Sequence, residues 1–139
     1  MRKPTVLVVD DHPGMVEELC KMLRPQFDIV GTASDGSTAF RTALELQPDL
    51  VLLDIEMPVL DGIQVSREIQ KSNITSRVIF VTMHQDEDYV SHALEAGARG
   101  YVFKSNLCYD LPTALVEVLA GRTFVSSQAP RPHPAGKSN

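Results

Sequence analysis

Acidic side chains close two apolar segments of the sequence. Asp10 and Asp11 follow the apolar residues 6–9, and Asp54 follows residues 50–53. If both segments are neighbouring parallel strands, the three carboxylates meet at the carboxyl edge of a sheet, where α/β folds place their ligands. Two unit charges about 4 Å apart repel by roughly 4 kcal/mol at an effective dielectric near 20. Such a cluster therefore calls for a cation.

Magnesium and a phosphoryl group would suit this cluster. Mg²⁺ takes oxygen ligands and keeps several waters, so Asp10, Asp11 and Asp54 are predicted to hold it, with Mn²⁺ as a substitute. A carboxylate can attack phosphorus and form an aspartyl phosphate, which makes Asp54 the predicted phosphoacceptor. Lys104 follows a third apolar segment and Thr82 ends a fourth. The lysine would supply a fixed positive charge, and the threonine would supply a hydroxyl donor for a phosphoryl oxygen.

Each of these residues alone has a simpler explanation. A single Asp after a strand is usually a turn or helix-cap residue. A lone Thr or Lys at the same place is more often a turn hydroxyl or a solvated surface charge. The combination favours chemistry, because unrelated causes would have to place all five side chains at strand ends.

The elements that must position these side chains follow from the alternation of apolar runs and helical patterns. Strands are predicted over residues 5–9, 28–32, 50–53, 78–81 and 101–103, and helices over 13–23, 37–46, from about 61, 87–96 and 110–119. Five such units predict an α/β fold with a five-stranded parallel sheet and helices on both faces. The first and third strands both end in acids, so they should be neighbours. The flavodoxin-like order 2-1-3-4-5 makes them so.

Length and composition limit the class of protein. The chain has 139 residues, 43% hydrophobic content and a net charge of -5. One domain is expected, and the negative charge disfavours direct nucleic-acid binding. No apolar stretch approaches the roughly 20 residues of a membrane span, and the N-terminus lacks the pattern of a signal peptide. Cys20 and Cys108 indicate reduced thiols in a cytoplasmic protein, with a disulfide between them as the alternative.

A change in composition predicts where the domain ends. The last residues alternate Pro130, Pro132 and Pro134 with small or polar residues, and they offer little to bury. We therefore expect a domain over residues 4–122. Residues 123–139 are expected to be a Pro-rich disordered tail or a linker.

Over residues 4–122 the chain resembles the receiver domains of two-component response regulators. The matching segments are Val8-Val9-Asp10-Asp11, residues 48–54, Met57-Pro58 with Asp61-Gly62, Thr82, and residues 96–98 leading to Lys104. The resemblance implies a CheY-like fold and phosphotransfer to Asp54 from a histidine kinase or a phosphotransfer protein. The details look most like the NarL/FixJ-type subgroup.

The resemblance also assigns roles within the site. Asp11 matches the direct metal ligand, and Asp10 matches the acid that binds the metal largely through water. The backbone carbonyl of Glu56 matches the third protein ligand. Thr82 and Tyr101 match the switch pair, in which the hydroxyl moves toward the phosphoryl group and the aromatic ring turns inward.

Several residues near the site depart from common receiver patterns or need separate interpretation. Ser105 follows Lys104 where many receivers have proline, and a cis bond before a non-proline residue costs about 2.5–4 kcal/mol, so we expect a trans bond and a differently shaped loop. His12 and His84 lack partners at zinc-ligand spacing and are interpreted as loop histidines at the rim of the site. His84 and Met83 are candidates for tuning the lifetime of the phosphoryl group or access to it.

The expected function is a phosphorylation-dependent switch rather than an enzyme. Its output would be transcription, through a helix-turn-helix domain absent from this chain, or protein contacts made by a stand-alone receiver; a homodimer is a further expected partner. A haloacid-dehalogenase-like phosphatase is an alternative, but Asp54-Ile55-Glu56 has glutamate where that class needs a second aspartate. A flavodoxin-like cofactor binder would place phosphate beside Asp10 and Asp11, which repel it. A contact-mediating pseudo-receiver would not need the complete acid set.

Overall fold

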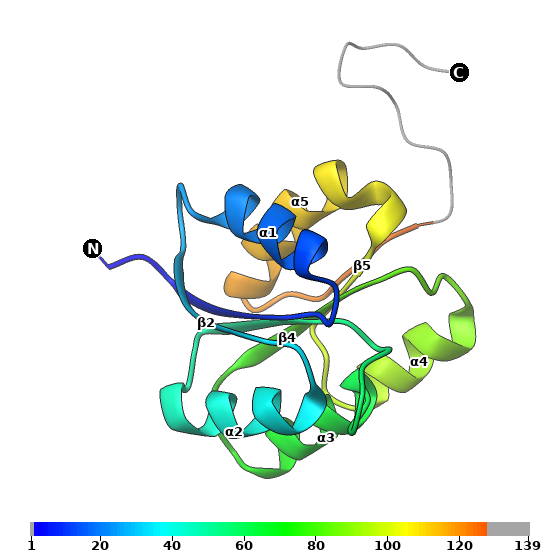
Figure 1. The fold of residues 1–139 in the computed structure, drawn as a ribbon. Helices are drawn as coiled ribbons and strands as arrows, with labels where there is room; N and C mark the ends of the chain where they lie inside the picture. Colours follow the sequence, from blue (N-terminus) through cyan, green and yellow to red (C-terminus); the bar gives the residue numbers. More distant parts are fainter. Residues whose placement is uncertain (1, 128–139) are drawn as a thin grey trace.

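The sheet of this protein has parallel strands and is covered by helices on both faces. The computed structural model describes residues 2–127. The strands, in the order β2-β1-β3-β4-β5-β6, are β1 (Thr5–Val9), β2 (Asp28–Ala33), β3 (Leu50–Leu53), β4 (Arg77–Thr82), β5 (Gly100–Phe103) and β6 (Phe124–Val125). The helices are α1 (Pro13–Leu23), α2 (Gly36–Leu46), α3 (Gly62–Lys71), α4 (Glu87–Glu95) and α5 (Leu107–Leu119). Helices α1 and α5 cover one face, and α2, α3 and α4 cover the other (Figure 1). The predicted fold class and the order of the first five strands are confirmed.

The two central strands are apolar on both sides because each side meets a helical layer. In β1 and β3, alternate side chains enter opposite cores. The core under α1 and α5 contains Val6, Val8, Leu50 and Leu52, and the core under α2, α3 and α4 contains Leu7, Val9, Val51 and Leu53. This double burial explains the unbroken apolar runs and holds the two strand ends rigidly side by side.

The start of α3 lies directly against the end of β3. Asp61 and Gln64 form a reciprocal capping box, with the Gln64 amide donating to Asp61 at 2.9 Å and the Asp61 amide donating to Gln64 at 3.0 Å. The Gly62 amide donates to the Ile55 carbonyl at 2.8 Å, and a Cβ at Gly62 would collide with the carbonyl oxygen of Asp54. The glycine therefore permits the close packing that fixes the backbone of Asp54.

A sixth strand extends the sheet within the segment that was expected to be a tail. Strand β6 pairs in parallel with β5, and Ser126 continues this attachment. The Ser126 amide donates to the Tyr101 carbonyl at 2.8 Å, and its hydroxyl donates to Asp110 at 2.6 Å while accepting from the Phe103 amide at 3.0 Å. The ordered chain thus continues past the expected boundary at residue 122. Residues 128–139 of the predicted tail lie outside the described residues.

Smaller expectations about the chain can also be compared with the structure. Helix α5 begins at Leu107, earlier than expected, because a 3₁₀ turn over Lys104–Asn106 leads straight into it. Cys20 is buried and Cys108 is exposed, and the two do not form a disulfide. Within residues 2–127, no helix has the length and apolar character needed to cross a bilayer.

Candidate functional site

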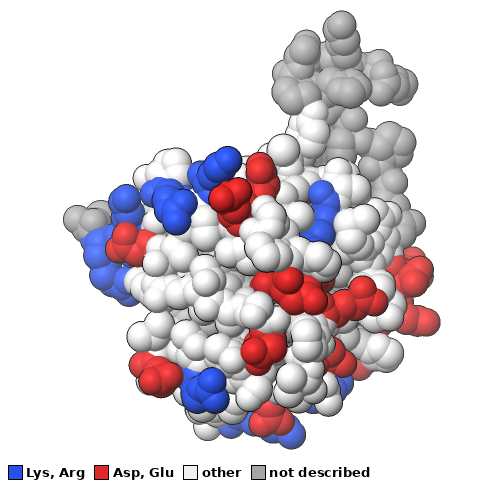
Figure 2. Space-filling view, viewed as in Figure 1, with Lys and Arg blue, Asp and Glu red and all other residues white. Residues whose placement is uncertain are grey.

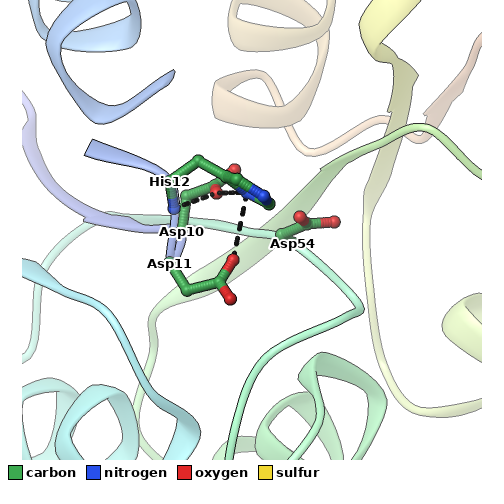
Figure 3. Close-up of side chains that lie close together, drawn as sticks. All are labelled: Asp10, Asp11, His12 and Asp54. Carbon is green, nitrogen blue, oxygen red and sulfur yellow. Dashed lines mark hydrogen bonds and ion pairs between the residues drawn. The ribbon is translucent and has the colours of Figure 1, made fainter. Parts of the chain in front are cut away.

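The three predicted carboxylates converge at the carboxyl edge of the sheet. Strands β1 and β3 are adjacent, with Val9 paired to Leu53, so Asp10 and Asp54 emerge side by side. Both of these aspartates are buried, at 2% and 5% exposure, whereas Asp11 is half-buried. Figure 3 shows Asp10, Asp11 and Asp54 gathered at this point. The sequence-based prediction that these residues meet is confirmed.

Lys104 bridges two of the carboxylates. Its Nζ lies 3.0 Å from Asp10 Oδ2 and 3.1 Å from Asp54 Oδ2, and its side chain is only 8% exposed. Burial lowers the pKa of Lys104, but its hydrogen bond to Asp10 and the charges of Asp54 and Asp10 outweigh burial, and the net pKa is raised. The ammonium group therefore stays charged at neutral pH.

His12 lies in the loop after β1 with a side chain that is 70% exposed, as expected for a histidine at the rim, and its ring also faces two of the carboxylates. Its Nδ1 lies 3.0 Å from Asp10 Oδ1 and 3.1 Å from Asp11 Oδ1 (Figure 3). The His12 amide also donates to Asp10 Oδ1 at 2.9 Å, which turns the residue back toward the acids. The signal that could have found it is Pro13: a helix starting there makes His12 the N-cap residue, directly beside the acid pair.

The donor set at this edge fits a divalent cation. Asp10, Asp11, His12 and Asp54 each offer one ligand atom, and these atoms lie within 4.8 Å of one another. Oδ1 of Asp11 is buried and makes no hydrogen bond, because its approach to His12 is an ion-pair distance without hydrogen-bond geometry. Three carboxylates facing one ammonium leave two negative charges in excess. An ion of charge +2 with a preference for oxygen ligands, such as Mg²⁺, matches this excess.

The predicted switch residues are linked through the backbone of His84. Thr82 is fully buried, and its Oγ1 accepts from the His84 amide at 3.3 Å. Tyr101 is also fully buried, and its hydroxyl donates to the His84 carbonyl at 2.8 Å. Burial, with the nearby charge of Asp54, raises the pKa of Tyr101, so the phenol stays protonated and can donate. The aromatic ring therefore lies inward in this structure.

The side chain of His84 connects two further parts of the site. Its ring stacks on Tyr89 of α4 with centroids 4.0 Å apart, and its Nε2 lies 3.2 Å from a carboxylate oxygen of Glu56. This gives Glu56 a contact through its side chain, while the role of its backbone carbonyl as a metal ligand stays a prediction. Met83 is 67% exposed, so an effect of this side chain on access to the site also stays a prediction.

The peptide bond after Lys104 is trans, as expected from the absence of proline. None of the described peptide bonds is cis, so the bond to Ser105 is trans. The chain turns through the 3₁₀ segment Lys104–Asn106, and Ser105 Oγ accepts a hydrogen bond from Gln85 at 2.9 Å. The loops after β4 and β5 are thereby connected on one side of the site.

Comparison with known proteins places these features in a family. The response regulator receiver domain family matches residues 6–115. The nitrate/nitrite response regulator NarL of Escherichia coli K12 is 34% identical over 125 residues, covering 88% of this chain and 57% of that protein. A LuxR-family response regulator from Aurantimonas sp. SI85-9A1 has a TM-score of 0.83 and 35% identity, covering 88% of this chain and 89% of the other.

A second solved structure gives the same result. The receiver domain of the putative response regulator NarL from Mycobacterium tuberculosis has a TM-score of 0.82 and 31% identity, covering 88% of this chain and all of that domain. The chain spans somewhat more than half the length of the curated relatives it matches. Because the family matches most of its length, this chain belongs to the response regulator receiver domain family. Its similarity to NarL and to LuxR-family regulators is that of the NarL/FixJ-type subgroup.

Proposed function

We propose that Asp54 accepts a phosphoryl group from a histidine kinase or phosphotransfer protein in a Mg²⁺-dependent reaction. The single observation that carries this proposal is the environment of Asp54. Its carboxylate is buried at the carboxyl edge of the sheet, close to Asp10 and Asp11 and 3.1 Å from the ammonium of Lys104. The family membership supports the same chemistry and a cytoplasmic location.

The contacts of Asp54 prepare it as a nucleophile. Its Oδ1 accepts from the Ile55 amide at 2.7 Å and its Oδ2 faces Lys104, so the carboxylate has one orientation. In the transfer, an Asp54 oxygen forms a bond to phosphorus while the bond from phosphorus to the donor's histidine nitrogen breaks. Lys104 keeps a positive charge beside the site of transfer. Asp10, Asp11, Asp54 and the Glu56 carbonyl would hold Mg²⁺, which would supply further positive charge beside the phosphoryl group.

Phosphorylation then changes the relative stability of two conformations. The Thr82 hydroxyl would turn toward the phosphoryl group, and this would weaken its contact with the His84 amide. Tyr101 is already buried and bound to the His84 carbonyl, so we expect phosphorylation to increase the population of this inward arrangement. In Tyr101→Phe, we expect phosphorylation to proceed while the resulting amide shifts in α4 shrink in NMR spectra. Full-sized shifts would count against this switch.

His84 and Met83 are proposed to tune how long the phosphoryl group lasts. The His84 ring spans from Glu56 to Tyr89 beside the site, so its removal would change access of water to the aspartyl phosphate. We expect His84→Ala to alter the rate of dephosphorylation, followed by intact mass after removal of the donor. Met83→Ala should have a smaller effect in the same assay. An unchanged rate in His84→Ala would contradict this role.

The proposed output is control of transcription by a helix-turn-helix domain that is not part of this chain. The similarity to NarL and to LuxR-family regulators supports this output, and a stand-alone receiver acting through protein contacts is the alternative. Acidic side chains gather across the middle of the face in Figure 2 and toward the side of α4, which opposes direct contact with nucleic-acid phosphates. A homodimer is a further proposed partner, testable by light scattering with and without phosphorylation.

A phosphatase and a flavin-binding protein would behave differently from this switch. A phosphatase would turn over a phosphate monoester many times, whereas a receiver takes one phosphoryl group per chain. A flavodoxin-like protein would purify yellow, yet here Asp10 and Asp11 occupy the loop after β1, where they would repel a cofactor phosphate. We therefore propose that the chain is not an enzyme of either class, although it assists its own phosphorylation and dephosphorylation.

Acetyl phosphate provides a direct test of the proposal. The protein is incubated with Mg²⁺ and acetyl phosphate, and its intact mass is recorded with and without EDTA. One added phosphoryl group, lost when EDTA is present, is the expected result. No addition, with Mg²⁺ binding measured separately, would contradict autonomous phosphorylation and favour a pseudo-receiver.

A further inference from the structure

We propose that His12 is a metal ligand of this site and shifts its preference from Mg²⁺ toward transition ions such as Ni²⁺. This inference rests on the metal site of the proposed function. The starting observation is that His12 Nδ1 lies 3.0 Å from Asp10 Oδ1 and 3.1 Å from Asp11 Oδ1. Figure 3 shows the ring directed at both carboxylates rather than away from them.

The distances from His12 Nδ1 to the two carboxylate oxygens match those between neighbouring ligands of one ion. In an octahedral site with bonds of about 2.1 Å, adjacent ligand atoms are about 3.0 Å apart. The two separations agree with this edge, and Asp54 belongs to the same four-residue group, whose ligand atoms lie within 4.8 Å of one another. The ring nitrogen and the Oδ1 atoms are thus placed as donors to a shared ion.

Lys104 leaves this group of donors available. It contacts Oδ2 of Asp10 and Oδ2 of Asp54, whereas His12 faces the other oxygen of Asp10, Oδ1. Oδ1 of Asp11 is buried without a hydrogen bond, so a cation would satisfy it. An ion between Asp10, Asp11 and His12 would not have to displace the lysine.

The chemistry of imidazole determines which ions would benefit. A neutral imidazole with its proton on Nε2 offers the Nδ1 lone pair, and such nitrogen ligands suit Ni²⁺, Cu²⁺ and Zn²⁺ better than Mg²⁺. The simpler arrangement is that Nδ1 carries a proton and donates it to Asp10 Oδ1, while Asp11 Oδ1 lies nearby without a hydrogen bond. If Nδ1 is a metal ligand, loss of the ring weakens Ni²⁺ binding more than Mg²⁺ binding. If Nδ1 is only a hydrogen-bond donor, loss of the ring has no selective effect on Ni²⁺.

Calorimetric titration of Ni²⁺ and Mg²⁺ distinguishes them. We compare the wild type with His12→Gln and with His92→Gln, a control on the exposed surface of α4. We expect His12→Gln to weaken Ni²⁺ binding roughly tenfold or more, the scale on which even outer-shell partners of ligands act, and to change Mg²⁺ binding less than about twofold. An equal effect on both ions, or none on Ni²⁺, would overturn the proposal.

The variant is expected to fold, because the His12 side chain is 70% exposed and makes no capping hydrogen bond to α1. A second measurement reports coordination itself. Pulsed electron paramagnetic resonance of bound Mn²⁺ should reveal a directly bound nitrogen in the wild type and in His92→Gln, and none in His12→Gln. Absence of nitrogen coupling in the wild type would exclude the ring as a ligand of Mn²⁺ and count against the proposal.

Phosphorylation with Mg²⁺ separates this inference from the proposed function. If the wild type takes no phosphoryl group but His12→Gln still loses Ni²⁺ selectivity, the phosphoacceptor function fails while the ligand assignment holds. If the wild type is phosphorylated and selectivity is unchanged in His12→Gln, the ligand assignment fails while the function stands.

Discussion

Two aspartates at opposite ends of the same short strand behave very differently. Asp49 precedes β3 and Asp54 follows it. The Asp49 carboxylate accepts from the amide of Thr5 at 2.8 Å, from the Thr5 hydroxyl at 3.2 Å and from Arg2 at 3.2 and 3.4 Å. One negative charge thus meets several donors, and the group fastens the start of β3 to the start of β1.

The other end of β3 has the opposite balance. Asp54 shares one ammonium, that of Lys104, with Asp10, and Asp11 lies in the same cluster. The difference between the two ends lies in the ratio of donors to charge rather than in residue type. A saturated carboxylate stabilises the fold, whereas a surplus of carboxylates retains the capacity to bind a cation and to react.

The largest expected effect is on phosphorylation, when Asp54 or Asp49, at the two ends of β3, is replaced by asparagine. Asp54→Asn should abolish phosphorylation by acetyl phosphate, because the amide cannot act as the nucleophile. Asp49→Asn should be phosphorylated like the wild type, since its side chain lies at the opposite edge of the sheet. Intact mass records both variants. A phosphorylated Asp54→Asn would break the comparison by showing that another residue is the acceptor.

Removing the ammonium group of Lys104 should destabilise the protein, because Asp10 and Asp54 would then repel each other without a shared partner. In Lys104→Met, the buried carboxylates of Asp10 and Asp54 lose their common partner, and we expect a loss of about 3 kcal/mol in the free energy of unfolding. Urea titrations in EDTA and in Mg²⁺ measure it, and Mg²⁺ should recover part of the loss. Equal stability of variant and wild type in EDTA would mean that the carboxylates do not depend on the lysine.

At the Asp49 end of β3, the expected loss in the free energy of unfolding is smaller and depends on pH. Asp49→Ala removes the acceptor of the Thr5 amide and should destabilise the protein by about 2 kcal/mol at neutral pH. The hydrogen bond from the Thr5 amide, more than the contact with Arg2, holds the pKa of Asp49 below its ordinary value. A lowered pKa adds stability that is complete above the unfolded value, about 3.9, and is lost as pH falls through the folded value.

The difference between wild type and Asp49→Ala should therefore shrink below about pH 4, as thermal or urea unfolding across pH can show. Arg2→Ala serves as the control. It removes only an exposed pair and should cost less than about 1 kcal/mol. If the stability difference between wild type and Asp49→Ala did not change with pH, the charge of the Asp49 carboxylate would have no part in fastening β3 to β1.

The smallest effect concerns strain in the loop after Asp54. Val59 is 84% exposed and has a φ of 73°, a left-handed conformation that β-branched residues rarely adopt. Val59→Gly should raise stability by about 1 kcal/mol in urea unfolding, because glycine adopts this conformation without the steric penalty. Val59→Ala keeps a Cβ and should recover less. A destabilised Val59→Gly would show that the loop is not strained.

The sequence alone determined the central strands and the placement of the acids. The apolar runs of β1 and β3 are local signals, and an Asp that follows a parallel strand lies at the carboxyl edge whatever the details of packing. For the same reason Lys104 and Thr82 were predictable from the ends of β5 and β4. The trans bond between Lys104 and Ser105 was also predictable, because a local steric preference of the peptide bond decides it.

Only the tertiary structure decided which side chains meet across distant segments. The attachment of β6 through Ser126 and the bond from Tyr101 to the His84 carbonyl have no periodic signature in the sequence. Each contact joins two segments that are far apart in the sequence, so it depends on how those segments pack in the fold. Local sequence patterns are set by neighbouring residues, whereas these contacts are set by the packing of the whole sheet.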